Sequence, residues 1–218
     1  MNAKRVIAVV PAYNEEDNII STIEDLRSNA PNIDYVVVND GSKDRTLQIC
    51  RDNGYRCLNL PVNLGLAGAF QTGMRYAYEH DYDYAIQFDA DGQHSAAYIC
   101  EMVGIAESTG ANIVIGSRFA TSKKPVSARM AGSALISAMI FLTTHNRIQD
   151  PTSGMRLFDK TVIPIFASGL DFGPEPDTIS LLIRWGYGVE ETQVEMRERV
   201  AGESYLNFTK SVTYMLRM

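Results

Sequence analysis

Cysteine is scarce in this 218-residue chain, and its scarcity argues against two structural classes. The three cysteines, Cys50, Cys57 and Cys100, show no CxxC or Cys/His spacing, so neither a disulfide framework nor a zinc site is indicated. Lys and Arg are also few, because 20 of them against 26 Asp and Glu leave a net charge of −6. Such an acidic chain argues against a nucleic-acid partner.

Long apolar runs are absent as well. No basic region followed by an apolar segment opens the sequence, so a cleaved signal peptide is not expected. The longest mostly apolar stretch, residues 128–144, contains Arg129, Ser133 and Ser137, and it is too short and too broken to span a bilayer. Together with reduced thiols, this predicts a cytoplasmic protein, associated at most with the inner face of the membrane.

The first half of the chain alternates short β-branched runs with amphipathic stretches, which is typical of βαβ units and a parallel sheet. Strands are expected over residues 6–10, 35–38, 57–60, 84–88 and 113–115. Helices are expected over residues 15–27, 43–53, 65–78 and 97–108. No linker or repeat interrupts this pattern, so we expect a single α/β domain with a Rossmann-like, mostly parallel sheet flanked by helices.

Polar loops follow three of these strands, at residues 11–16, 39–46 and 89–94, where open α/β sheets bind their ligands. Asp89 and Asp91 flank one small residue, so both carboxylates can turn toward one cation such as Mg²⁺ or Mn²⁺, which also binds substrate phosphates. Gln93 is the preferred further ligand over His94, which is otherwise a supporting or an exposed residue. The alternative is a solvated acidic turn.

Asp40 follows the second strand and precedes a helix, where a carboxylate can accept hydrogen bonds from a base or a ribose. The alternative is an Asp-Gly turn in which Ser42 caps the helix. At the start of the first expected helix, Glu15 or Glu16 either contacts a nucleotide or only favours the helix dipole.

Taken in order, the three loops resemble those of family 2 glycosyltransferases of the GT-A fold, which carry PxYNE, (N/D)DGSxDxT and DxD. Residues 63–69, NLGLAGA, look like the NxGxxxA segment of that family. The resemblance implies a metal-dependent, inverting transfer of a hexose from a nucleotide-sugar, with a UDP-sugar preferred over GDP-mannose. It places the second Asp of DxD at the metal, and it implies nucleotide contacts for Pro11, Ala12, Tyr13, Glu15, Asp40, Gly68, Asp89 and Ala90.

Two segments of the second half resemble polyprenyl-phosphate sugar transferases such as dolichyl-phosphate mannose synthases. They are the DPTSG-like residues 150–156 and the RxxGxS-like residues 199–204. The resemblance implies a catalytic role for Arg199 and an acceptor-phosphate contact for Ser204, and Arg118 is a further cation able to approach a phosphate. Each Arg could instead be a surface ion-pair partner. Tyr205 stands where those synthases have Lys, so a cell-surface glycan acceptor is weighed beside a polyprenyl phosphate.

A sugar hydroxyl acceptor needs a general base, whereas a phosphate is already anionic and needs none. Asp177, near an expected helix start, is the first candidate base and Glu175 is the second. The alternative for both is helix capping and compensation of the helix dipole.

The resemblance divides the domain into a nucleotide-sugar-binding half (1–117), an acceptor half (118–204) and a C-terminal helix (205–218). This last segment mixes apolar residues with Lys210 and Arg217, so it is a candidate for a peripheral membrane contact, a homo-oligomer contact or a cover for the sheet. Two other functions stay open. A sugar-nucleotide pyrophosphorylase should carry a Gly-rich loop near the N-terminus, where residues 11–16 have no Gly, and a catalytically inactive nucleotide-binding or scaffold module would not need both DxD carboxylates.

Overall fold

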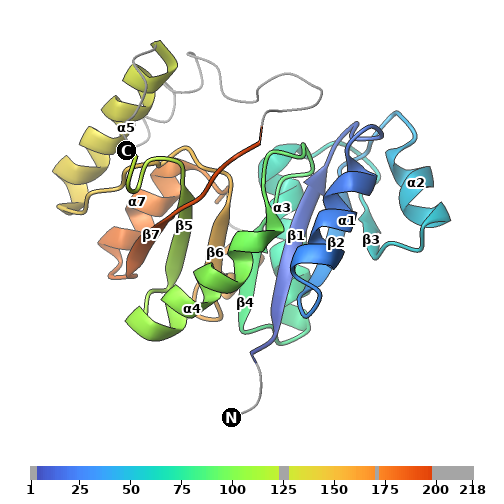
Figure 1. Cartoon of the computed structure of the whole chain (residues 1–218), viewed down its shortest axis with the longest axis horizontal. Helices are drawn as coiled ribbons and strands as arrows, with labels where there is room; N and C mark the ends of the chain where they lie inside the picture. Colours follow the sequence, from blue (N-terminus) through green and yellow to red (C-terminus); the bar gives the residue numbers. More distant parts are fainter. Residues whose placement is uncertain (1–3, 123–127, 170–171, 198–218) are drawn as a thin grey trace.

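The computed structural model describes residues 4–122, 128–169 and 172–197, which form one sheet covered by helices (Figure 1). The strands are β1 (Val6–Ala12), β2 (Asp34–Asn39), β3 (Cys57–Asn59), β4 (Tyr84–Gln87), β5 (Ile113–Ser117), β6 (Arg156–Asp159) and β7 (Val189–Gln193). The helices are α1 (Ile19–Asn29), α2 (Thr46–Asp52), α3 (Gly65–Glu79), α4 (Ile99–Thr109), α5 (Ala128–Thr144), α6 (Ile163–Ala167) and α7 (Pro176–Arg184), with a 3₁₀ turn, η1, at Ala96–Tyr98. Arg199, Ser204 and the expected helix over 205–218 lie outside the described residues.

The sheet has the strand order β3-β2-β1-β4-β6-β5-β7. Its pairs are parallel except for those of β6, which runs antiparallel to both β4 and β5. Gln87 at the end of β4 pairs with Arg156 at the start of β6. The residues that lead into β6 therefore lie at the carboxyl end of β4, where the parallel strands also end.

Alternating residues of each central strand build the core on the two faces of the sheet. In β1, Ala8 and Val10 pack with α1 and α4, whereas Ile7 and Val9 pack with α3. Figure 1 shows α1 and α4 on one face and α3 on the other. Burial on both faces explains why the central strands are continuously apolar rather than alternating, and the expected α/β class with a mostly parallel sheet is confirmed.

Two helices begin later than the sequence predicts. The first begins at Ile19 rather than residue 15, and the second at Thr46 rather than residue 43. Backbone N–H groups ahead of both helices bond across to the other loop, as described below, and ahead of α1 the chain forms only a turn, in which Ile19 N donates to Glu15 O (2.9 Å). Local helical pattern cannot reveal this competition, because the hydrogen-bond partners lie about 30 residues away in the chain.

The mostly apolar stretch at residues 128–144 is helix α5, which packs against α7. Within the described ranges, no helix combines the length and the apolar character needed to cross a membrane.

Candidate active site

The polar loops after β1, β2 and β4 lie at one edge of the sheet, because these three strands are parallel neighbours. In Figure 1 this is the upper edge, toward which β1 points. The structure therefore brings together the three loops that the sequence singled out.

Backbone N–H groups of the first loop bind side chains of the second. Asn14 N donates to Ser42 Oγ (3.0 Å) and Glu15 N to Thr46 Oγ1 (2.8 Å). In return, Lys43 N donates to Asn14 Oδ1 (2.8 Å). Ser42 is thus a bridge between loops and not the expected helix cap, since α2 has Arg45 at its N-cap position.

The remaining predicted residues of the first loop line the end of β1. Pro11 and Ala12 are buried strand residues, and the following Tyr13 is 41% exposed. Glu15 precedes α1 by four residues, and its carboxylate accepts a hydrogen bond from Asn18 Nδ2 (2.8 Å). The exposed ring of Tyr13 beside a rigid loop is available to a flat ligand such as a base.

Asp40 is buried and joins its loop to the segment before α3. Its amide donates to Ala12 O (2.9 Å), and its Oδ1 accepts from Leu64 N (2.7 Å). Gly41 has a φ of +63°, and a Cβ there would lie 2.7 Å from Asn63 N, so the expected Asp-Gly turn is present and admits only glycine. Gly68 lies in the first turn of α3, where an added Cβ would meet the Leu64 side chain.

Asp89 and Asp91 lie just beyond β4, on either side of the buried Ala90. Asp89 Oδ1 accepts a hydrogen bond from Gln87 Nε2 (2.9 Å), and Asp91 Oδ1 accepts one from Gln93 N (3.1 Å). Burial raises the pKa of Asp89, and the nearby charge of Asp91 adds to the rise. Burial and mutual repulsion make it costly in free energy to keep both carboxylates ionised here. A bound cation would offset this cost.

The donor set fits a hard divalent cation with few protein ligands. Two carboxylates supply oxygen, and Gln93 lies half-buried beside them. The backbone carbonyl oxygen of Gln93 accepts a hydrogen bond from Arg197 N (2.9 Å). Among the described residues, no group of three or more His, Cys, Asp and Glu is gathered in a metal-binding arrangement. The remaining ligands would then be phosphate oxygens and waters, which is the way Mg²⁺ usually binds.

His94 supports the backbone of Asp89 and is not an exposed residue. It is buried, and its Nδ1 accepts a hydrogen bond from Asp89 N (3.0 Å). This bond requires an unprotonated Nδ1, so the neutral ring carries its hydrogen at Nε2, which lies 3.8 Å from Asp89 Oδ2.

Gly154, in the DPTSG-like segment, is a contact of Asp89 that the sequence did not single out as a site residue. A Cβ at Gly154 would overlap Asp89 Oδ2 and lie 3.3 Å from both Asp89 Cγ and His94 Cε1. The close approach follows from the antiparallel β6, which starts opposite Gln87. The segment after β4 and the DPTSG-like segment therefore meet at Asp89.

Arg156 joins this segment to the loop before α7. Its side chain is almost fully buried, and it donates from Nη2 to Pro151 O (2.6 Å) and from Nη1 to Pro174 O. The positive charge of Arg156 also acts against the rise in the pKa of Asp89. A fully buried guanidinium is costly without partners, so Arg156 is a second functional candidate that sequence reasoning missed.

Arg118, the predicted phosphate contact, forms a bidentate ion pair with the fully buried Asp150. Its Nε and Nη2 lie 2.7 and 2.8 Å from the Asp150 oxygens, and Nη2 also donates to Thr152 Oγ1 (3.1 Å). Burial acts to raise the pKa of Asp150, but the hydrogen bonds and charge of Arg118 outweigh it and hold that pKa below its ordinary value. Arg118 therefore forms an ion pair, as in the alternative considered from the sequence. Its partner Asp150 lies in the same DPTSG-like segment as Gly154.

Glu175 and Asp177 both lie at the start of α7. Glu175 occupies the N-cap position without a side-chain capping bond, and Asp177 Oδ1 accepts from Thr178 N (3.0 Å) within the first turn. The preceding loop is held by Arg156 and by Gln71 Nε2, which donates to Phe172 O (2.7 Å). Arg156 therefore connects the loop that precedes the two candidate bases with the DPTSG-like segment, which contacts Asp89.

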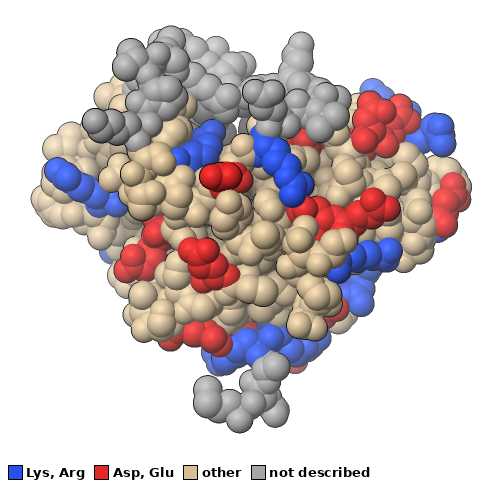
Figure 2. Space-filling model, in the orientation of Figure 1, with Lys and Arg blue, Asp and Glu red and all other residues tan. Residues whose placement is uncertain are grey.

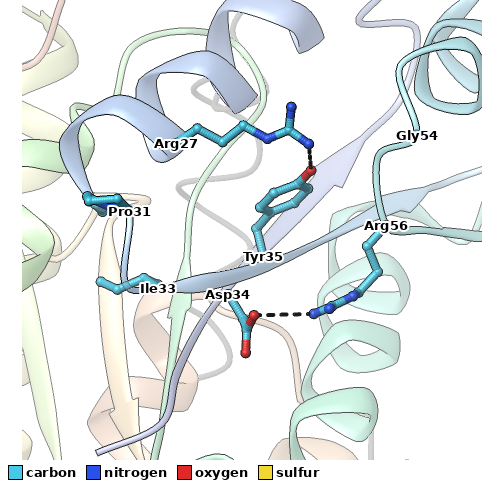
Figure 3. A pocket seen from close by; sticks show the side chains of 8 residues that line it. Arg27, Pro31, Ile33, Asp34, Tyr35, Gly54 and Arg56 are labelled. Carbon is cyan, nitrogen blue, oxygen red and sulfur yellow. Dashed lines mark hydrogen bonds and ion pairs between the residues drawn. The ribbon is translucent and has the colours of Figure 1, made fainter. Parts of the chain in front are cut away.

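A separate pocket of about 340 Å³ lies around the start of β2, at the opposite edge of the sheet from these loops (Figure 3). Its two guanidinium groups are occupied, because Arg27 Nη2 donates to Tyr35 Oη (2.8 Å) and Arg56 pairs with Asp34 (3.7 Å). This pocket contains none of the predicted site residues.

Comparisons with known proteins place the chain in a family. The model of the family described as "Glycosyl transferase family 2" matches residues 7–165. A UDP-N-acetylglucosamine–dolichyl-phosphate N-acetylglucosaminyltransferase of Methanococcus voltae is 30% identical over 192 residues, covering 78% of this chain and 75% of that protein. An undecaprenyl-phosphate mannosyltransferase of Micrococcus luteus is 29% identical over 221 residues, covering 93% and 88%.

Solved structures share the fold. Glucosyl-3-phosphoglycerate synthase of Mycobacterium tuberculosis, in complex with Mn²⁺, UDP and phosphoglyceric acid, superposes with a TM-score of 0.67 at 16% identity, covering 99% of this chain and 75% of that one. A mannosyltransferase of Pyrobaculum calidifontis, in complex with GDP-mannose and Mn²⁺, gives a TM-score of 0.68 at 17% identity, covering 94% and 59%. These likenesses identify the GT-A fold.

Proposed function

Because the chain belongs to glycosyl transferase family 2, we propose that it transfers a hexose with inversion from a nucleotide-sugar to a polyprenyl phosphate. A UDP-sugar is the preferred donor and GDP-mannose the second. The observation that carries the proposal is the contact of Gly154 with Asp89, since it joins the acceptor segment to the carboxylates that suit a cation and a diphosphate.

The proposed donor site lies along the upper edge of the sheet. Tyr13 and the buried Asp40 would hold the base and ribose, and Asp89 and Asp91 would hold Mg²⁺ or Mn²⁺, with Gln93 beside them. When bound, the cation would offset the negative charge that develops on the leaving diphosphate. The role of the protein is to fix these oxygens before the reaction, which avoids the cost of ordering them during it.

The proposed acceptor site lies on the Asp150–Arg156 segment. An acceptor phosphate oxygen would attack the anomeric carbon as the bond to the diphosphate breaks on the opposite side. The ion pair with Asp150 orients Arg118, and Arg199 and Ser204, outside the described residues, would be further phosphate contacts. The M. voltae and M. luteus relatives are both named for lipid-phosphate substrates, which supports this choice over a glycan hydroxyl.

The test is a donor and acceptor screen on the purified chain. UDP-glucose, UDP-N-acetylglucosamine and GDP-mannose would each be incubated with Mn²⁺ and either a short-chain polyprenyl phosphate or an oligosaccharide, and sugar transfer would be measured. We expect transfer to the polyprenyl phosphate, its loss with EDTA, and its loss in Asp91→Ala with the melting temperature unchanged.

Other outcomes of the screen would point elsewhere. Transfer to the oligosaccharide alone would replace the acceptor and make Asp177 or Glu175 the proposed base. Pyrophosphate exchange with a sugar 1-phosphate would indicate a pyrophosphorylase, and Mn²⁺-dependent nucleotide binding without turnover of any pair would favour an inactive binding module. Full activity of Asp91→Ala would refute the metal assignment.

A further inference from the structure

Positive charge is segregated in one part of this acidic chain. Residues 108–149 contain no Asp or Glu, but they contain Arg118, Lys123, Lys124, Arg129 and Arg147. Since the whole chain carries −6, this +5 segment leaves −11 on the remaining residues. The segment spans β5 and α5 and ends immediately before Asp150, the first residue of the acceptor segment.

Helix α5 lies within this segment and is apolar on two sides. Met130, Ile136 and Ile140 are buried, and Thr143 Oγ1 lies 3.2 Å from Ser180 Oγ of α7. On the other side, Leu135, Phe141 and Leu142 are 49%, 40% and 69% exposed. A helix that is apolar on both sides is typical of one that contacts an apolar partner on the second side.

The charges around α5 indicate what kind of partner this is. Residues 130–144 include no charged side chain, and just beyond the helix the guanidinium of Arg147 lies 5.7 Å from the ring centre of Phe141. At the left of Figure 2, where grey atoms do not cover the end of α5, the visible atoms are tan and blue. An apolar stripe flanked by cations is the composition of a helix that lies in the surface of an anionic membrane.

We propose that the exposed face of α5, defined by Leu135, Phe141 and Leu142, docks on an anionic lipid surface. The choice of a lipid surface over a protein partner rests on the proposed lipid-phosphate acceptor. Docking there would set the Asp150 segment close to the membrane, because the chain passes from α5 to Asp150 in five residues. The sequence motifs predict a membrane contact at residues 205–218 instead, and those residues lie outside the part of the chain that the structure describes.

Vesicle binding by the full chain tests this proposal. Wild type, Leu142→Glu and Leu135→Glu would be co-sedimented with vesicles of phosphatidylcholine alone and of phosphatidylcholine with 30% phosphatidylglycerol (on the order of the anionic content of cell membranes). We expect binding to the anionic vesicles that falls with added salt, and about a tenfold loss in each variant, since an exposed apolar side chain that would enter the lipid is replaced by a carboxylate with the same sign of charge as the lipid.

Tyr78→Glu is the matched control. Tyr78 is 56% exposed near the end of α3, at the opposite edge of the sheet, so the same change of charge there should leave binding as in wild type. Unaltered vesicle binding in both α5 variants would refute the proposal, and so would no binding by wild type. A wild-type dimer that Leu142→Glu dissociates would assign the face to a second copy, and a lowered melting temperature with unaltered binding would assign it to residues 198–218; either result overturns the proposal.

The two proposals fail in different ways. If the function is right and the docking surface wrong, the wild type transfers sugar to the short-chain acceptor but does not bind vesicles. If the docking surface is right and the function wrong, the chain binds anionic vesicles through α5 without transfer to a polyprenyl phosphate. If both are right, Leu142→Glu loses activity only toward a long-chain acceptor embedded in vesicles.

Discussion

Gly154 lies so close to Asp89 that any larger residue must displace the carboxylate. An alanine Cβ would overlap Asp89 Oδ2 and lie 3.3 Å from both Asp89 Cγ and His94 Cε1. His94 is buried and bonded to Asp89 N, so it cannot yield easily. The carboxylate would have to move by about 1 Å to restore normal contacts, and a misplacement of that size costs about 100-fold in rate, or ~2.7 kcal/mol.

The stability of Gly154→Ala should change little. The φ of Gly154 lies outside the left-handed region, so alanine fits the backbone and restricts the unfolded chain, which contributes about 0.4–1 kcal/mol. This gain offsets part of the strain at Asp89. The predicted result is a folded protein whose kcat/KM is reduced about 100-fold and whose Mn²⁺ affinity is weakened.

Gly104→Ala provides the control for this measurement. Gly104 lies in α4 with nothing within 4 Å of its Cβ position, so alanine should stabilise the helix by about 0.5–1 kcal/mol and leave activity unchanged. The assay is initial-rate sugar transfer at several Mn²⁺ concentrations, with melting temperatures for each variant. Wild-type kcat/KM in folded Gly154→Ala would refute the reasoning, and an equal loss in Gly104→Ala would show that the effect is not local.

Three further predictions concern the loops around the site. Arg156→Met should lower the free energy of unfolding by about 2–4 kcal/mol, measured by urea denaturation, because it removes the buried donors to Pro151 O and Pro174 O; a loss below about 0.5 kcal/mol would contradict that role. Asp150→Asn should cost ~1–3 kcal/mol at pH 7. Because the folded pKa of Asp150 is lowered, this contribution is present above the unfolded pKa of about 3.9 and is lost as the pH falls through the folded pKa, so wild type and variant should converge in unfolding experiments at acid pH, and a constant gap would refute the assignment. Gly41→Ala should cost ~1–3 kcal/mol and weaken UDP binding in calorimetry, because its φ is +63° and its Cβ would lie 2.7 Å from Asn63 N; unchanged UDP affinity would separate this turn from the nucleotide site.

The sequence alone was sufficient for the α/β class and for the edge of the sheet that carries the site. Strands such as β1 and β4 are buried on both faces, so their apolar runs are continuous and readable without the fold. Carboxyl ends of parallel neighbours must meet, so Asp40 and Asp89 could be assigned to one edge from their places after strands. The helix starts could not be read in this way, since Asn14 and Ser42 bond to each other rather than to their own helices.

The tertiary structure decided how the second half of the chain reaches that edge. Strand β6 inserts antiparallel between β4 and β5, and no local pattern predicts this, because pairing between distant segments depends on the register of the whole sheet. The insertion sets Gly154 against Asp89 and turns Arg156 into a buried link between two loops. Residue types and their order determined which groups are available, whereas the contacts between distant segments determined which of them meet.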